Sequence, residues 1–253
     1  MYACPCCGYR TLPKSPPGSG ELCPVCFWED VYPFSEEWTY NRQSLRSAQR
    51  KFLAVGASHE DWLDIVRAPT EEETRDPNWQ TLDQQETDIR AELIRNIQTA
   101  FAHVQREDGV TLHQARVIDD YGGEAAQQVA RTKDIDVHWW DVPDQWIETL
   151  GDVLSFLDPT GFRYYIPAYM VWTIEHYQTS HSLTVDFTIY ALGLHKDRNE
   201  YKLRNFELMD EAQSQAICRF LRYLVKFGGF DADGSAAQNA LEKYWGQFCS
   251  AQS

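Results

Sequence analysis

Apolar residues at helical spacing dominate the chain from about residue 84 onward. Ile89, Leu93, Ile97 and Phe101 recur at four-residue intervals and predict a core-facing helix over 84–105. Residues 182–194 alternate as a strand would but also fit a helical stripe, and we favour the helix. The same periodicity predicts further helices over 112–121, 124–133, 166–177, 211–227 and 236–248.

The N-terminal third has a different pattern. One short helix is predicted over 43–55, and Gly56 stands where a glycine commonly ends a helix. Residues 67–79 contain Pro69 and Pro77, so they are interpreted as an extended linker. We therefore expect two domains, residues 1–80 and residues 84–253, the second mainly α-helical.

Two C-x-x-C motifs stand in the first 26 residues, Cys4 with Cys7 and Cys23 with Cys26. Their separation is typical of tetrahedral thiolate zinc sites, in which each motif aims two sulfurs at one point. Four cysteine ligands leave no open coordination position, so we expect one structural Zn²⁺ ion. The alternative, two disulfides, is disfavoured in a reducing compartment.

The other three cysteines have less defined roles. Cys6 could replace Cys4 or Cys7 as a ligand, act as a reactive thiol, or pack as a small apolar residue. Cys218 and Cys249 fall within predicted helices and are expected to be free thiols. No apolar leader follows Met1, and no stretch approaches the roughly 20 apolar residues of a membrane span. A cytoplasmic location without membrane contact is therefore expected.

The net charge of −15 is distributed unevenly. Residues 1–60 are balanced, whereas residues 61–137 carry 17 acidic and 8 basic side chains, and residues 138–253 carry 15 and 9. Binding to phosphate backbones needs a basic surface, so nucleic acid is an unlikely partner for most of the chain. Such acidity is typical of ordinary soluble proteins, and it also suits docking of a basic protein.

The cysteine motifs lie within a longer segment that resembles the bacterial cysteine-rich CPCC family. The resemblance covers about 80 residues and implies a small zinc-ribbon-like fold without an established activity. The expected fold class is therefore a small zinc-ribbon-like N-terminal domain plus a mainly α-helical C-terminal domain. The residues that carry the resemblance are 4–9, 16–19, 23–30, Asn41, 44–45, 66–70 and 75–79.

Residues from about 84 onward are similar to a second, uncharacterised bacterial family. The longest matching segment is LSFLDPTGFRYYIPAYM, at residues 154–170. Shorter segments match at 110–116, 119–122 and 140–143. The resemblance implies a soluble α-helical domain of unknown role.

Several residues of this second domain are candidates for chemistry or interaction. His113, Arg116 and Asp120 could face one side of a helix as base, cation and carboxylate. In the structural alternative, Asp119 or Asp120 pairs with Arg116 near the helix end. No sequence motif of a hydrolase, metalloprotease or nucleotide-binding loop is present, which lowers the expectation of catalysis.

Aromatic residues and one arginine form a further candidate interaction set. The chain holds nine tryptophans, including Trp139 and Trp140, and some could form an exposed patch for a protein partner. Arg163 is expected either to stack between Tyr164 and Trp140 or to pair with an aspartate. Asp158 precedes Pro159 and is expected to cap the turn that follows.

Three functions remain open from the sequence. The leading hypothesis is a protein-interaction role, most specifically an immunity (antitoxin-like) protein that neutralises a basic toxin. The second is a zinc-ribbon nucleic-acid adaptor, supported by four basic residues near the predicted 43–55 helix. The third is an enzyme that uses His113 and Asp120. The basic residues in question are Arg42, Arg46, Arg50 and Lys51.

Overall fold

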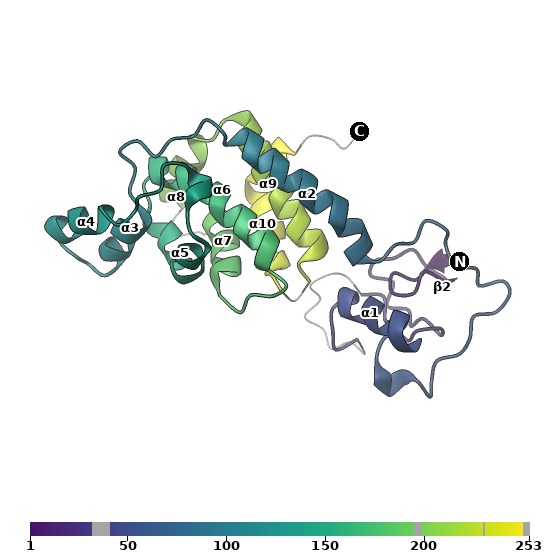
Figure 1. Cartoon of the computed structure of the whole chain (residues 1–253). Coiled ribbons are helices and arrows are strands. Elements are labelled where there is room, and N and C mark those ends of the chain that lie inside the picture. Colours follow the sequence, from purple (N-terminus) through teal and green to yellow (C-terminus); the bar gives the residue numbers. More distant parts are fainter. Residues whose placement is uncertain (32–40, 195–198, 230, 250–253) are drawn as a thin grey trace. The chain divides into compact units, whose positions relative to one another are not determined.

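The computed structural model describes residues 1–31, 41–194, 199–229 and 231–249 (Figure 1). The chain divides into two compact units, unit 1 (residues 1–89) and unit 2 (residues 90–253), and the boundary falls inside one helix. The predicted fold class, a small cysteine-rich unit followed by a mainly α-helical one, is confirmed. Among the described residues, no helix has both the length and the apolarity to cross a membrane.

Unit 1 contains β1 (Tyr2–Ala3), β2 (Arg10–Leu12), α1 (Leu45–Val55), the 3₁₀ turn η1 (Glu60–Trp62) and the start of α2 (Leu82–Ala100). In unit 2 the rest of α2 is followed by α3 (Leu112–Asp119), α4 (Glu124–Arg131), η2 (Trp139–Asp141), α5 (Asp144–Thr149), η3 (Asp152–Phe156), α6 (Pro159–His176), α7 (Thr184–Leu192), α8 (Asn199–Glu207), α9 (Glu211–Phe227), α10 (Gly234–Lys243) and η4 (Trp245–Phe248).

The buried core of unit 1 is built largely from cysteine. Five of the nine buried residues in its main described cluster are cysteines, and the others include Leu12, Trp28 and Ala48. The two short strands pair antiparallel beside it. A core this small supplies little hydrophobic stabilisation, so unit 1 depends on what its cysteines bind.

Helix α1 begins two residues after the predicted start and ends at the predicted residue, Val55. The Ser44 hydroxyl accepts the backbone N–H of Ser47 at 3.2 Å as the N-cap. Gly56 takes a left-handed φ of 87°, and its N–H donates to the Phe52 carbonyl at 2.9 Å. The expected glycine terminus is confirmed, because glycine adopts this conformation without the strain that a Cβ brings.

Residues 67–79 do not form the linker that the prolines suggested. The segment packs back on unit 1: the N–H of Arg10 donates to the Thr74 carbonyl, and the N–H of Asp76 donates to the Gly8 carbonyl. Tyr9 and Arg75 form an isolated β-bridge. The prolines indicated only that this segment is not helical. It packs on unit 1 because its backbone pairs with residues far away in the sequence.

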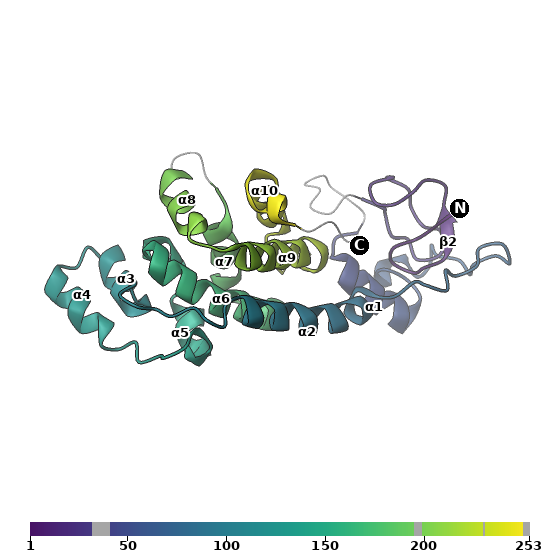
Figure 2. The same ribbon diagram turned by 90° about the horizontal axis from the view of Figure 1, so that it is seen from above.

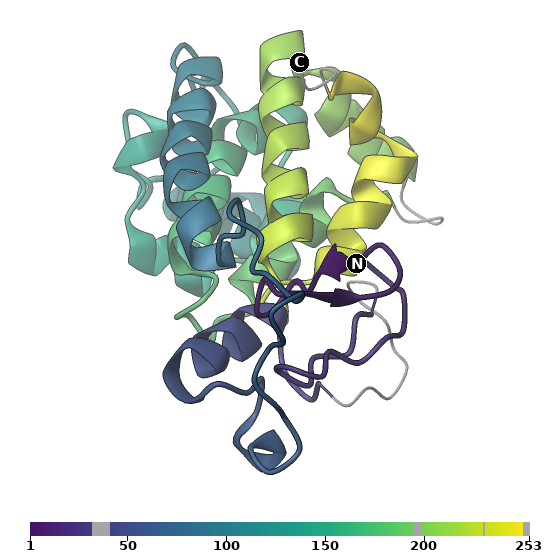
Figure 3. The same cartoon turned by 90° about the vertical axis from the view of Figure 1, so that its right-hand side faces the viewer.

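Unit 2 is a helical domain around a core rich in aromatic residues. Helices α3 and α4 pack as a hairpin (Figure 2). Helix α10 lies beside α9 (Figure 3). The predicted helices over 182–194 and 211–227 are confirmed as α7 and α9. Helices α5 and α8 were not predicted, because each is short and lacks a clear apolar stripe.

Helix α2 ends at Ala100, five residues before the predicted end. Side chains from elsewhere take the backbone carbonyls at this end: Gln213 Nε2 donates to Ala100 at 3.3 Å, and Trp139 Nε1 donates to Phe101 at 3.0 Å. Phe101 and Val104 are still buried, which explains why the apolar periodicity continued beyond the helix. Tertiary hydrogen bonds thus replaced the last helical turn.

Helix α6 begins seven residues before the predicted start at residue 166 and contains a proline in its interior. Pro159 occupies the first turn, where no N–H partner is needed, and Asp158 caps the helix by accepting the Gly161 N–H at 2.9 Å. Pro167 lies inside the helix. Its missing hydrogen bond is tolerated because α6 is buried over most of its length, where packing outweighs a cost of roughly 3 kcal/mol.

The C-terminal helix and its cysteine also differ from expectation. Helix α10 ends at Lys243, and Tyr244 leaves the helical region before η4 begins. This break lets η4 fold back on α9. Cys218 and Cys249, which were expected to be thiols, form a disulfide with a Cα–Cα distance of 5.6 Å.

Candidate metal centre and placement of the predicted site residues

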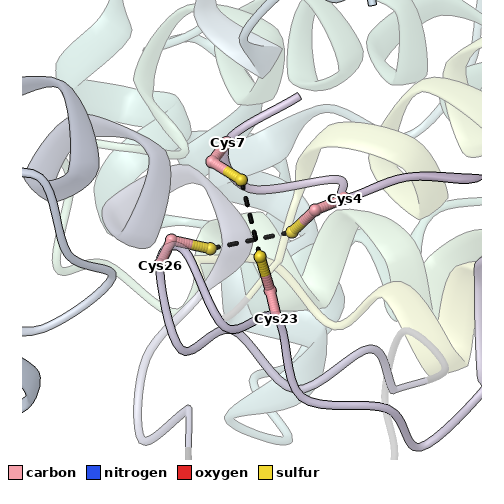
Figure 4. A group of neighbouring side chains, drawn as sticks. All are labelled: Cys4, Cys7, Cys23 and Cys26. Carbon is pink, nitrogen blue, oxygen red and sulfur yellow. Dashed lines mark hydrogen bonds between the residues drawn. The ribbon is translucent and has the colours of Figure 1, made fainter. Parts of the chain in front are cut away.

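Four cysteine sulfurs of unit 1 converge on one point (Figure 4). The Sγ atoms of Cys4, Cys7, Cys23 and Cys26 all lie within 4.8 Å of one another, and all four residues are fully buried. The pairs Cys4–Cys26 and Cys7–Cys23 are each 3.7 Å apart, too far for a disulfide. This arrangement can hold one metal ion with four protein ligands.

Two similar backbone loops present these sulfurs. In the first, the Gly8 N–H donates to the Cys4 carbonyl at 2.8 Å; in the second, the Phe27 N–H donates to the Cys23 carbonyl at 2.7 Å. Both residues that follow the second cysteine take positive φ, 80° for Gly8 and 61° for Phe27. The left-handed residue reverses the chain after each motif, so that both thiols point inward.

Segment 74–79 closes over the first cysteine loop. Trp79 Nε1 donates to the Pro5 carbonyl at 3.0 Å, and Arg75 Nε donates to the Cys7 carbonyl at 2.9 Å. The Arg75 guanidinium also lies 4.3 Å from the centre of the Trp79 ring. In the sequence, Arg75 and Trp79 were indicated only by the family resemblance, because their spacing does not match a metal-site motif.

Gln49 is a buried residue of this site that sequence reasoning missed. Its Nε2 donates to the Pro5 carbonyl at 2.9 Å, and its Oε1 accepts the Leu82 N–H at 2.8 Å. One amide thus ties the first cysteine loop to the start of α2. A lone glutamine in a helix gives no sequence signal for such a role.

The buried thiols need a positive charge to ionise together. Burial, followed by the neighbouring thiols, raises the pKa of Cys26, and contact with Cys23 raises the pKa of Cys7. A bound metal cation would reverse this by stabilising the thiolates. Thr11 adds a further contact, with its Oγ1 3.1 Å from Cys23 Sγ. The donor set therefore fits a cation that prefers sulfur.

Cys6 is fully buried but stands outside the four-sulfur group. The structure thus favours the interpretation of Cys6 as a small packed residue over that of an exposed reactive thiol.

The basic residues of α1 are largely engaged within unit 1. The Arg46 side chain is only 5% exposed and pairs with Glu86 at 2.8 Å and with Asp83. Arg50 also pairs with Asp83, at 2.7 Å. Two of the four cations that suggested nucleic-acid binding are therefore neutralised by α2 carboxylates.

The members of the trio His113, Arg116 and Asp120 have different surroundings. His113 Nδ1 lies 3.0 Å from an oxygen of Asp134. Arg116 pairs with Asp119 at 2.9 Å and with Asp152, as the structural alternative anticipated for Asp119. Asp120 ends α3 and is exposed. His113 and Arg116 thus each contact a carboxylate from outside α3, Asp134 and Asp152, which helical spacing did not indicate.

Two buried aspartates after α4 were missed by sequence analysis. The Asp134 carboxylate accepts the backbone N–H of His113, and one of its oxygens lies 3.0 Å from His113 Nδ1. Asp136 pairs with Arg106 at 2.9 Å, and neither carboxylate is exposed. Arg106 also donates to the Tyr165 hydroxyl at 3.0 Å, and burial raises the pKa of Tyr165 so that it stays neutral. These groups form an internal polar network.

The remaining predicted residues have structural partners. Trp139 is buried, whereas Trp140 is 50% exposed and stacks on His138 at 4.5 Å between ring centres. Arg163 does not stack between aromatic rings; its Nε donates to Gln213 at 3.0 Å, and its guanidinium lies 3.7 Å from Asp210. Of this set, Trp140 is the residue whose large apolar surface reaches solvent.

Comparison with known proteins places both parts of the chain. Residues 89–249 match a family model described as a family of unknown function (DUF6714), and the chain belongs to this family. Residues 2–73 match the model described as cysteine-rich CPCC, in agreement with the resemblance of the N-terminal segment. No curated protein and no solved structure matches the chain.

Proposed function

We propose that this protein is a zinc-stabilised binding protein for a basic protein partner and, in its most specific form, an immunity protein that neutralises a toxin in the cytoplasm. The observation that carries this proposal is the acidity of the first part of unit 2. Residues 107–148 hold ten acidic and three basic side chains. Complementary charge of this density accelerates encounter with a cationic partner.

Two of the three cations of this stretch are engaged by the chain itself. Arg116 pairs with Asp119 and Asp152, and Arg131 donates to the Gly109 carbonyl at 2.8 Å and to Gln114 at 3.2 Å. The exposed carboxylates, in contrast, include Asp120, Glu124, Asp141 and Asp144. The exposed charge of this stretch is therefore predominantly negative.

The four-cysteine centre supports zinc as the metal. Sulfurs at the corners of a tetrahedron around Zn²⁺, each about 2.3 Å from the ion, stand about 3.8 Å from one another. Two of the sulfur pairs are 3.7 Å apart. Cys4, Cys7, Cys23 and Cys26 would hold the ion, which would cross-link the two loops. Its role would be structural, because protein ligands fill all four positions. Thiolate ligands of this kind persist in a reducing compartment.

Co-expression tests the proposed partner. The chain is expressed with each small basic protein encoded beside it in its genome, and growth, co-purification and affinity are measured. We expect one such protein to arrest growth alone, to be tolerated with the chain, and to bind it with an affinity that falls as salt rises.

A charge-reversed variant provides the control for this experiment. Changing Asp120, Glu124 and Asp144 to lysine alters exposed side chains, so the fold should be kept while protection is lost. The comparison variant changes two adjacent carboxylates of unit 1 that are also exposed, Glu71→Lys with Glu72→Lys, and should leave protection intact. The proposal is wrong if no basic protein binds, or if the unit 2 variant protects as well as the wild type.

A further inference from the structure

The segment between α4 and η2 has an inverted pattern of burial. Asp134 and Asp136 have side chains with no exposure, while Ile135 is 81% exposed and Val137 is 71% exposed. Alternation with period two is the pattern of an extended strand, with one face inward and one face outward. Here the carboxylates occupy the inner face and the branched aliphatic side chains the outer one.

Contacts to the two buried aspartates stabilise this inverted pattern of burial. Arg106 pairs with the Asp136 carboxylate and donates to the Asp134 carbonyl at 3.2 Å, and His113 donates its backbone N–H to the Asp134 carboxylate. These contacts fix the segment and aim Ile135 and Val137 at solvent. A sequence selected for stability alone would bury the aliphatic side chains, so a preorganised display of them indicates a binding surface.

In the described part of unit 2, the strongly exposed large hydrophobic side chains are concentrated in the stretch of sequence that contains this segment. Of the large hydrophobic side chains in the described part of unit 2 that are exposed by half or more, five of six belong to residues 121–140. They are Tyr121, Val129, Ile135, Val137 and Trp140, and the sixth is Leu183.

The backbone of the segment is also available. The N–H and C=O groups of residues 135–137 make no hydrogen bond to any other residue in the described ranges. In Figure 2 the segment belongs to the connection between the α3–α4 hairpin and α5. A short segment outside the helices, with unpaired backbone polar groups and side chains that alternate between inside and outside, can pair with another strand.

We propose that residues 135–137 bind an extended segment of the partner protein by strand addition. This inference rests on the proposed function and names the surface that would serve it. Ile135 and Val137 would contact apolar side chains on alternate positions of the added strand. The exposed carboxylates of Asp141 and Asp144, which follow the segment in the chain, favour lysine or arginine at the positions between those apolar side chains. The partner segment is therefore a strand of alternating apolar and basic residues.

A synthetic peptide provides the probe. An octapeptide of alternating lysine and valine, blocked at both ends, is titrated against the full-length chain by fluorescence anisotropy, and amide hydrogen exchange is followed. We expect saturable binding and at least tenfold slower exchange at residues 135–137. The same peptide N-methylated on alternate residues keeps its side chains but cannot pair its backbone, and should bind at least tenfold more weakly.

Matched variants locate the site. Ile135→Ser with Val137→Ser should weaken peptide binding at least tenfold, whereas Leu183→Ser with Leu208→Ser, two other exposed positions of unit 2, should leave it within twofold. All four positions are at the surface, so the fold should persist, which circular dichroism checks. Equal binding of the N-methylated peptide, or unchanged binding by the first variant, overturns the proposal.

The test of this docking segment can fail independently of the test of the proposed function. If a basic protein partner binds the Ile135→Ser, Val137→Ser chain with wild-type affinity, the docking segment is wrong and the binding function stands. If the peptide pairs with residues 135–137 while no basic protein binds, the segment stands and the proposed function fails.

Discussion

Gly8 lies directly against the indole of Trp79. A Cβ placed on Gly8 would come within 2.6 Å of Trp79 Cγ, and Gly8 itself holds a φ of +80°. The absence of a side chain at residue 8 thus allows the segment after residue 73 to cover the first cysteine loop. The match to the cysteine-rich family model ends at residue 73, but the packed unit continues through Trp79.

Gly8→Ala should therefore destabilise unit 1 through two effects. Left-handed backbone costs an alanine about 1–2 kcal/mol, and the clash with Trp79 adds a further cost of about 1–3 kcal/mol. Urea unfolding followed by tryptophan fluorescence measures the sum. Gly20→Ala is the matched control: its φ is +69°, but nothing lies within 4 Å of the added Cβ. Equal losses for the two variants would contradict the packing argument.

Removing the metal should unfold unit 1 alone. Its main core cluster is mostly cysteine, and without a cation the four thiols lose their shared partner. We expect about one zinc ion per chain by elemental analysis. After chelation, the helical circular dichroism of unit 2 should persist while unit 1 becomes sensitive to protease. Loss of helical signal and protease resistance across the whole chain would show that the two units fold together.

Arg46→Met should be costly because it leaves a buried carboxylate without its cation. The side chains of Arg46 and Glu86 are each 5% exposed and lie 2.8 Å apart. Removing one member of such a pair costs about 3–5 kcal/mol. Arg50→Met is the control, since the Arg50 side chain is 58% exposed and its loss should cost less than about 1 kcal/mol. Chemical denaturation compares both with the wild type.

Cys218 and Cys249 should be found as a disulfide in protein purified in air. Thiol labelling after denaturation with a chelator should then modify five cysteines, and seven after reduction. Closing a loop of this sequence separation, 31 residues, stabilises the fold by about 3–4 kcal/mol. Cys249→Ser should lower the free energy of unfolding by that order. Seven labelled cysteines before reduction would show that the pair is open.

The Glu73 carboxyl should titrate with a pKa of about 2 in the native chain. Its two oxygens accept from Arg67 at 2.7 Å each, and one also accepts the Thr70 N–H at 2.8 Å. Because the folded pKa lies below the unfolded value, the contact stabilises the chain above about pH 4.5 and is lost as the pH falls toward 2. NMR titration measures this, and Glu73→Gln should remove the dependence. A pKa near 4 would contradict it.

The features that could be predicted are those that residues close together in the sequence encode. Two cysteines three residues apart must lie on one tight loop, so the candidate ligands were evident before the fold was known. Asp158 could be predicted to cap the turn that follows it, because a cap bonds only to its own first turn. Pro167 lies inside α6, because the penalty of a proline is local whereas the packing that overcomes it is not.

The amino-acid sequence by itself determined the four thiols, the helical character of unit 2 and the excess of negative charge. Each follows from composition or from contacts within a few residues along the chain. Tertiary structure decided that His113 faces Asp134 rather than Asp120, that Trp79 covers Gly8, and that Ile135 points to solvent. These relationships depend on groups brought together from distant positions, whose pairing energies no periodicity or spacing encodes.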